Sequence, residues 1–172
     1  ISIAQWGLGN YNLFLESKEH IYYEKFIRSA NWLVNNMEKN KFGFYVWMHH
    51  FNFEYRDTLI SPWYSGLAQG QGISVLIRAF KETNEDIYKD TIEKALKVFD
   101  KDIKSGGVNH IDSNGDSWIE EYIVFPPTHI LNGFIWGLWG LYDYAIFFQD
   151  KKILEKFLSY STTITKNLKK YD

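Results

Sequence analysis

The chain has 172 residues, a length that suits one domain. Its 19 basic and 21 acidic residues nearly balance, so the charge gives no indication of a nucleic-acid partner. The absence of cysteine excludes disulfides, thiolate zinc sites and cysteine nucleophiles. Aromatic residues make up 19% of the chain, which fits either a core rich in rings or a groove on which sugars stack.

Two sequence registers repeat along the chain. The segments around Ala4, Ala68 and Leu131 resemble one another, at spacings of 64 and 63 residues. A second register downstream of each segment repeats in two steps of 66 residues. Two registers that repeat together indicate three copies of one structural unit.

Each unit is predicted to be a pair of helices. The first helix of a pair is apolar nearly all round, at 66–80 and 131–148, and the second is amphipathic, at 21–37, 87–99 and 153–168. This alternation predicts an all-α fold, an α/α barrel (toroid) of helical hairpins. The alternative is a helix-pair solenoid, whose usual period is roughly 34 residues.

Three helix pairs are too few to close such a ring. The terminal pairs then need a cap or further units to cover their apolar faces. We therefore expect residues 1–172 to be a single domain of α/α-barrel type that is part of a longer protein. The alternative is that several copies of the chain associate as a homo-oligomer.

Two long connections lie between the helix pairs. Residues 42–55 are rich in aromatic residues that favour strands, and residues 107–122 surround an Asn114-Gly115 turn signal. We expect both connections to form short β-hairpins at the same end of the helical ring. Ordered loops on a rigid scaffold are a common place for a functional site.

One apolar stretch is long enough to be considered either as a membrane span or as a helix buried in the core. Residues 130–148 are mostly apolar, but they contain Asn132 and Asp143. We interpret this stretch as a helix buried in a helical protein rather than as a membrane span.

The densest polar cluster is DSWIEEY at residues 116–122. In a strand, Glu120 and Tyr122 would share one face and Glu121 would take the other. One of the two carboxylates would then point into the ring if the loop folds over it. The alternative is a pair of solvated glutamates on a hairpin.

A second cluster is SPWYSGLAQGQG at residues 61–72. Tyr64 offers a stacking ring and Gln69 an amide, which makes both candidate substrate-binding residues. The glycines would equally allow two helices to pack closely.

Other polar residues give weaker signals. His49 and His50 would face opposite sides of a strand and so would not share a metal ion. The acidic loop at 112–116 lacks the glycine and the distal glutamate of a calcium loop, and His129 would cap or bind at a helix start. We predict no metal site.

At the two clusters the sequence resembles a known family. SPWYSGLAQGQGISVLIRAF (61–80), WIEEY followed by PPTHILNGFIWGLWGLYD (118–143) and AQWGLGNYNLF (4–14) resemble the C-terminal domain of D-glucuronyl C5-epimerases, isomerases of heparan sulfate biosynthesis. The resemblance implies an α/α-barrel domain and the epimerisation of glucuronate to iduronate within a polysaccharide. Animal members of the family reside in the Golgi lumen, and the residues of this chain give no indication of a compartment.

The resemblance also implies roles for four residues. Glu121 and Tyr122 match the catalytic glutamate and tyrosine, Asn132 matches a substrate-contacting asparagine, and Trp136 matches an aromatic residue that is usually tyrosine. The family usually has proline directly after Glu-Glu-Tyr, where this chain has Ile-Val-Phe. A further catalytic tyrosine and β-rich N-terminal portions of the family have no counterpart here, so we expect the piece alone to be inactive.

The implied chemistry is proton transfer at C5. One group removes the proton and another returns it on the opposite face, so no cofactor is required. Two alternatives stay open. A glycosidase or lyase on a helical toroid would shorten uronate polymers, and a non-catalytic carbohydrate-binding or scaffold domain would bind them without needing Glu121.

Overall fold

Six α-helices in three consecutive hairpins make up most of the protein, whose computed structural model describes residues 1–56 and 58–172. The pairs are α1 (Ser2–Ser17) with α2 (His20–Asn35), α3 (Gly66–Thr83) with α4 (Asp86–Leu96), and α5 (Leu131–Phe148) with α6 (Lys151–Asn167). Short 3₁₀ helices follow, namely η1 (Lys97–Asp100), η2 (Ile103–Ser105) and η3 (Leu168–Tyr171). The predicted mostly helical fold of three helix pairs is confirmed.

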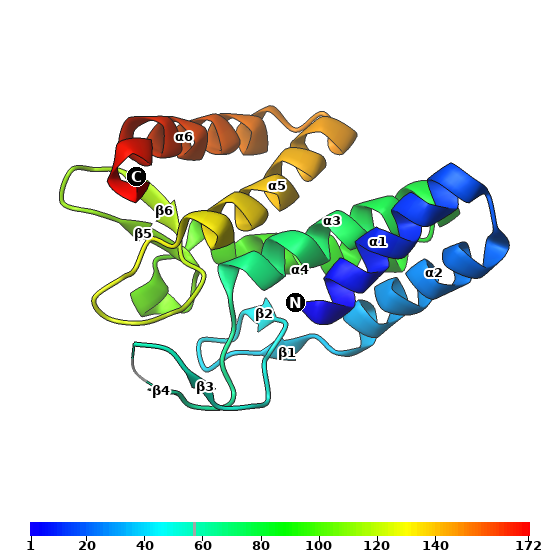
Figure 1. The fold of residues 1–172 in the computed structure, drawn as a ribbon, viewed down its shortest axis with the longest axis horizontal. Helices are drawn as coiled ribbons and strands as arrows, with labels where there is room; N and C mark the ends of the chain where they lie inside the picture. The colour runs from blue at the N-terminus through cyan, green and yellow to red at the C-terminus, as the bar shows by residue number, and fades with distance from the viewer. Residues whose placement is uncertain (57) are drawn as a thin grey trace.

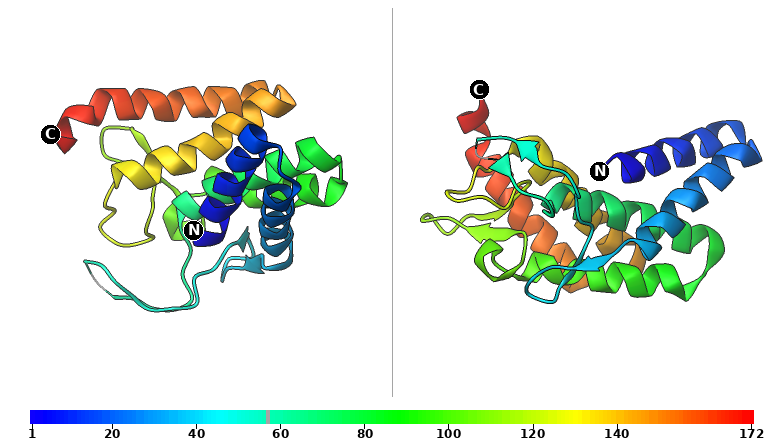
Figure 2. Two further views of the ribbon diagram at one scale, coloured as in Figure 1. Left: turned by 45° about the vertical axis from the view of Figure 1, so that its right-hand side comes forward. Right: turned by 90° about the horizontal axis from the view of Figure 1, so that it is seen from below.

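Helix α3 lies at the centre of this arrangement (Figure 1). It contacts α4, α5, α1 and α2, and the outer pairs α1–α2 and α5–α6 lie on either side of the middle pair (Figure 2). Every residue from Gly66 to Ile77 is buried. The prediction of a helix that is apolar nearly all round is therefore correct for α3. Large buried side chains of the surrounding core include Phe26, Ile73, Ile92, Phe134 and Leu141.

Glycines bring α3 and α5 into backbone contact. A β-carbon on Gly70 would lie 2.5 Å from backbone atoms of Gly137, and one on Gly140 would overlap Gly70. Real side chains cannot come this close, so only glycine allows the two helices to approach to this distance. The sequence left open whether the glycines of 61–72 allow two helices to pack closely. The structure shows that Gly70 allows this between α3 and α5.

Helix α5 is less buried than the sequence suggested. Trp139 and Ile146 remain 52% and 53% exposed, and on α1 Trp6 is 49% exposed. These side chains belong to the outer pairs, which the middle pair covers on one side only. The three pairs form an arc, and closure into a barrel stays a prediction. Within the described residues, no helix combines the length and the apolar composition that crossing a bilayer demands.

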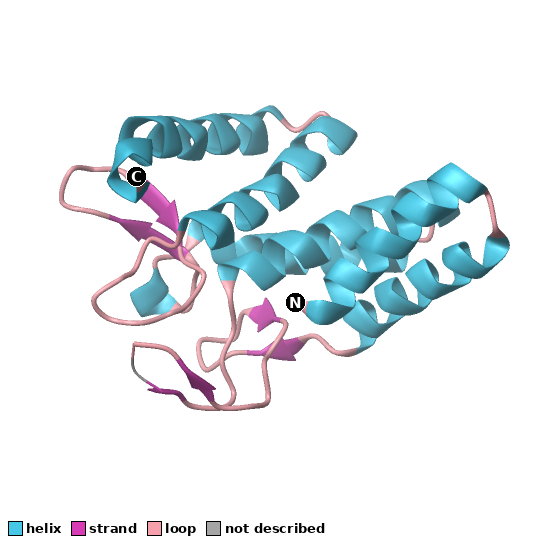
Figure 3. Cartoon of the chain, viewed as in Figure 1, coloured by secondary structure: helices cyan, strands magenta, loops and turns pink. Residues whose placement is uncertain are grey.

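Three two-stranded antiparallel hairpins of the described residues cluster at one end of the helices (Figure 3). They pair β1 (Glu38–Lys39) with β2 (Tyr45–Val46), β3 (Phe53–Glu54) with β4 (Thr58–Leu59), and β5 (Asn109–Ile111) with β6 (Ser117–Ile119). The hairpin predicted within 107–122 is present. The segment 42–55 instead contributes one strand to each of two hairpins, because its aromatic run continues past the first turn.

Candidate active site

The polar cluster 116–122 begins one residue before β6 and continues past its end at Ile119. Glu120 is fixed by its backbone, since its amide donates to Val108 O at 2.8 Å and its carbonyl accepts from Gly66 N at 3.0 Å. Gly66 is the first residue of α3, so the cluster is attached to the central helix. The strand alternation predicted for 120–122 does not apply, because β6 ends one residue before Glu120.

Glu121 places its carboxylate in a buried position without a hydrogen-bond partner for one oxygen. The residue is only 6% exposed, and Oε2 has no partner within the described chain. The side chain packs against Gly133, where a β-carbon would overlap the carboxylate. Burial raises the pKa of Glu121 above its ordinary value. A carboxylate with a raised pKa is a stronger base than a solvated one.

Tyr122 lies in a cluster of rings beside Glu121. Its ring centroid is 4.6 Å from that of Tyr55, 5.5 Å from Phe53 and 5.7 Å from Trp63. Burial, followed by the negative charge of Glu121, raises the pKa of Tyr122 to about 12. The phenol is therefore protonated near neutral pH and is available as a donor next to the carboxylate.

Asn132 and Trp136 lie on α5, one turn apart. Asn132 is exposed in the first turn, and Trp136 is half-buried with its ring edge-on to Trp139 at 4.9 Å. Their spacing puts them on one side of the helix, whereas Gly133 faces Glu121. No hydrogen bond is found between Asn132 and Glu121 in the described part of the chain, and substrate contact by Asn132 and Trp136 stays a prediction.

The two residues predicted from the second cluster have different surroundings. Tyr64 is half-buried, its hydroxyl donates to Gly107 O at 3.3 Å, and burial raises its pKa to about 12. Gln69 is completely buried on α3, and neither atom of its amide has a partner in the described chain. The same holds for Gln71, which sequence reasoning did not single out. Gln69 is thus enclosed by the protein, and substrate binding by this side chain stays a prediction.

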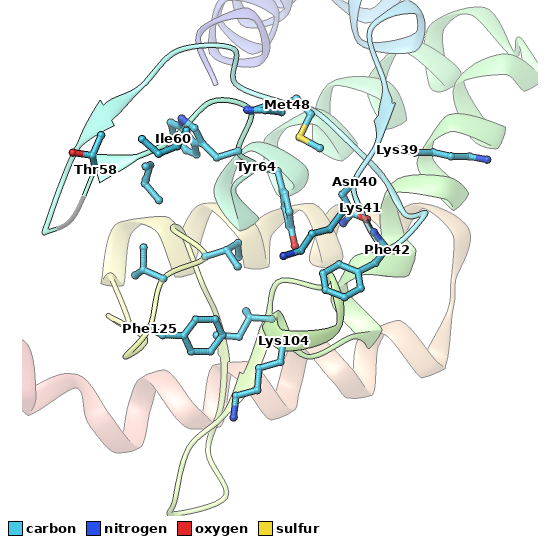
Figure 4. Close-up of a pocket in the computed structure, with 16 residues that line it drawn as sticks. Lys39, Asn40, Lys41, Phe42, Met48, Thr58, Ile60, Tyr64, Lys104 and Phe125 are labelled. Carbon is cyan, nitrogen blue, oxygen red and sulfur yellow. Dashed lines mark hydrogen bonds between the residues drawn. The ribbon is translucent and has the colours of Figure 1, made fainter.

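A groove of about 820 Å³ opens next to the ring cluster (Figure 4). Trp63 lines this groove and also contacts Tyr122, which connects the groove to the predicted catalytic pair. Of the six predicted site residues, Tyr64 is the one that lines it among the described residues. The aromatic side chains of the wall are Phe42, Trp63, Tyr64 and Phe125, and the basic ones are Lys39, Lys41 and Lys104.

The lysines of the groove have no carboxylate partner in the described part of the chain. Within residues 1–56 and 58–172, Lys39, Lys41 and Lys104 form no ion pair with a carboxylate. Lys41 instead lies over the ring of Phe42, at 5.2 Å from its centroid. Rings combined with unpaired cations fit a sugar chain that carries acidic groups. Sequence reasoning missed these lysines, although Lys39 and Lys41 alternate next to an aromatic run.

A family described as D-glucuronyl C5-epimerase C-terminus matches residues 38–172. This chain belongs to that family. Its resemblance to the family, inferred above from three sequence blocks, is thereby confirmed. All six predicted site residues lie within the matched range.

Two relatives extend this comparison. The D-glucuronyl C5-epimerase of Caenorhabditis elegans is 40% identical over 128 residues, which are 74% of this chain and 20% of that protein. An uncharacterized protein of Methanocaldococcus jannaschii is 27% identical over 125 residues, which are 71% of this chain and 40% of that protein. The chain thus spans about a fifth and two fifths of these relatives.

Proposed function

We propose that this chain supplies one side of the active site of a C5-epimerase that acts on glucuronate residues within a polysaccharide. The observation that carries the proposal is the buried Glu121 carboxylate, which lies beside the protonated Tyr122 and has one oxygen without a hydrogen-bond partner among the described residues. A buried polar group without a partner is costly and is often retained for chemistry. Membership of the epimerase family supports the same assignment.

The reaction needs only proton movement. Glu121, ionised, takes the proton from C5 of the uronate, and the electron pair of the broken C–H bond delocalises into the sugar carboxylate. A proton returned to C5 from the opposite face gives the epimer, so no atom and no electron is lost. On this proposal the opposite group is the tyrosine that the family resemblance places outside this chain.

Tyr122 has a separate task in this scheme. Removing the proton puts a second negative charge on the sugar carboxylate, and that charge must be stabilised. Tyr122 stays protonated because its pKa is about 12, so its hydroxyl can donate to the developing oxyanion. Asn132 and Trp136, on the exposed side of α5, are proposed contacts for the sugar.

The groove suits the rest of the polymer. Its rings would stack against sugar faces, and Lys39, Lys41 and Lys104 would pair with uronate carboxylates. Because Trp63 links the groove to Tyr122, a chain that lies in the groove would reach the catalytic pair. The proposed substrate is therefore an extended uronate polymer of the heparosan or heparan sulfate type rather than a free sugar.

The test is hydrogen exchange at C5 in deuterated water, with full-length protein and a heparosan oligosaccharide. Glu121→Gln should lower the rate at least about 100-fold, the range expected for loss of a general base. Glu155→Gln, an exposed change on α6, is the matched control and should leave the rate unchanged. A wild-type rate in Glu121→Gln would refute the assignment.

The groove by itself also favours a second candidate, a non-catalytic carbohydrate-binding domain. That function predicts oligosaccharide binding with no deuterium incorporated by the full-length protein. A lyase or glycosidase would instead shorten the oligosaccharide, which gel filtration of the products detects. Deuterium at C5 without shortening supports the epimerase over both.

A further inference from the structure

The carboxylate of Glu120, directly before Glu121, is fully buried and fully partnered. The residue is 0% exposed. Its Oε2 accepts from the backbone amides of Thr128 at 3.2 Å and His129 at 3.1 Å, and its Oε1 bonds to Nδ1 of His129 at 2.6 Å. A buried carboxylate is tolerated only with donors of this kind. Because the carboxylate accepts, Nδ1 of His129 carries the hydrogen.

These bonds close a loop around the predicted catalytic pair. Glu120 stands at one end of residues 121–128, fixed by its backbone to Gly66 and Val108. Its side chain binds the other end of the loop through Thr128 and His129. Glu121 and Tyr122 lie inside the closed segment, immediately after the fixed residue.

His129 is itself held from several sides. Its ring stacks on Trp118 at 4.3 Å and faces His110 at 5.6 Å, with 20° between the planes in both cases. The hydroxyl of Tyr171 donates to its carbonyl oxygen. Its φ of 50° is in the left-handed region, which residues other than glycine and asparagine rarely adopt. A conformation of this kind persists where surrounding contacts determine it.

We propose that Glu120 and His129 form a clasp that holds Glu121 and Tyr122 in their reactive arrangement. His129 is a positioning residue in this proposal, and it acts through Glu120 rather than on the sugar. The inference rests on the proposed function, because the arrangement it preserves is that of the proposed base and donor. Sequence reasoning considered His129 only as a cap or ligand and did not connect it with Glu120.

Two substitutions at position 129 separate the hydrogen bond from the backbone conformation. His129→Asn keeps a donor at the place of Nδ1 and accepts a positive φ, whereas His129→Gly accepts the same φ without any donor. Glu120→Gln is a third variant, which puts an amide in place of the accepting carboxylate. Glu155→Gln on α6 again serves as the control.

The experiment measures kcat and KM for C5 hydrogen exchange in the full-length protein, together with deuterium uptake of residues 121–128 by mass spectrometry. His129→Gly should lower kcat about 100-fold with little change in KM, which is the cost expected when a reacting group is misplaced by about 1 Å. Uptake of the loop should rise in the same variant. His129→Asn should restore most of kcat and normal uptake.

Three results would overturn the clasp. They are a wild-type kcat in His129→Gly, equal losses in His129→Gly and His129→Asn, and unchanged uptake of residues 121–128 in His129→Gly. If His129→Gly does not fold, Glu120→Gln decides, since it should show the same loss of kcat. A wild-type rate in Glu121→Gln would instead refute the proposed function, while the uptake measurement still reports on the clasp.

Discussion

The carboxylate of Glu121 rests on the backbone of Gly133, at the first turn of α5. Any side chain at position 133 would overlap the carboxylate, so the glycine leaves the space that Glu121 occupies. The same contact explains why Glu121 is buried although it follows a hairpin strand. The position of the proposed base, Glu121, is thus determined by the start of α5 as well as by its own loop.

Gly133→Ala should be destabilising because the added methyl group would collide with Glu121. We expect the free energy of unfolding to fall by roughly 1–3 kcal/mol, the usual cost of overpacking. Urea denaturation measures the change. Gly9→Ala in α1 is the matched control, since a β-carbon there meets nothing within 4 Å. That variant should gain about 0.5–1 kcal/mol from helix propensity, and a similar gain in Gly133→Ala would contradict the packing described.

Burial of Glu121 also predicts how stability depends on pH. The pKa of Glu121 is raised in the folded state, so its protonated form is favoured there and folding is penalised once the group ionises. Wild-type protein should lose stability as the pH rises from the ordinary glutamate pKa of 4.5 through the raised value. Glu121→Gln should lack this loss and be the more stable protein at pH 7. Denaturation at pH 4 and pH 7 compares the two, and parallel pH dependences would contradict the prediction.

The lysines of the groove should contribute to binding of an acidic polymer. The triple variant Lys39→Gln, Lys41→Gln, Lys104→Gln should weaken binding of a heparosan oligosaccharide and reduce its dependence on salt. Calorimetry in the Glu121→Gln background measures binding without turnover. A triple glutamine variant at the exposed residues 151, 152 and 170 makes the same change in charge and should bind like the parent. Equal weakening in both triples would show that overall charge, not the groove, determines affinity.

Gly70→Ala should be among the more damaging single substitutions in the chain. Its β-carbon would lie 2.5 Å from the backbone of Gly137, which cannot move without separating α3 from α5. We expect a loss of about 3 kcal/mol, at the upper end of overpacking costs. Thermal unfolding against the Gly9→Ala control measures it. A melting temperature equal to that of the wild type would show that the two helices do not meet as described.

The helices were predictable because their signals are local. Repeated registers and the alternation of apolar and amphipathic segments located all three pairs, and Asn114-Gly115 located the β5–β6 hairpin. The division of residues 42–55 between two hairpins was not predictable, because strand pairing depends on partners outside the segment.

The site was predictable only in part. The family resemblance indicated Glu121 and Tyr122, whose catalytic roles stay a proposal, and the structure adds that burial raises the pKa of both side chains. The groove joins lysines from separate loops, and the contact of Glu120 with His129 depends on how the single connection between β6 and α5 folds back on itself, so neither could be read from the sequence. Burial is a second property that the sequence did not report, since Gln69 lies near a helix start but is enclosed by packing, and its role in substrate binding stays a prediction.

The backbone contact between α3 and α5 affects more than stability. Gly66 at the start of α3 anchors Glu120, Gly133 at the start of α5 supports Glu121, and Ile119 packs on Gly66 and on Gly137 between them. The two helices therefore hold residues 119–121 between them, and a substitution that increases the distance between α3 and α5 would loosen the position of the proposed base. Substitutions of the glycines between α3 and α5 should consequently lower the rate of the proposed reaction in parallel with the melting temperature.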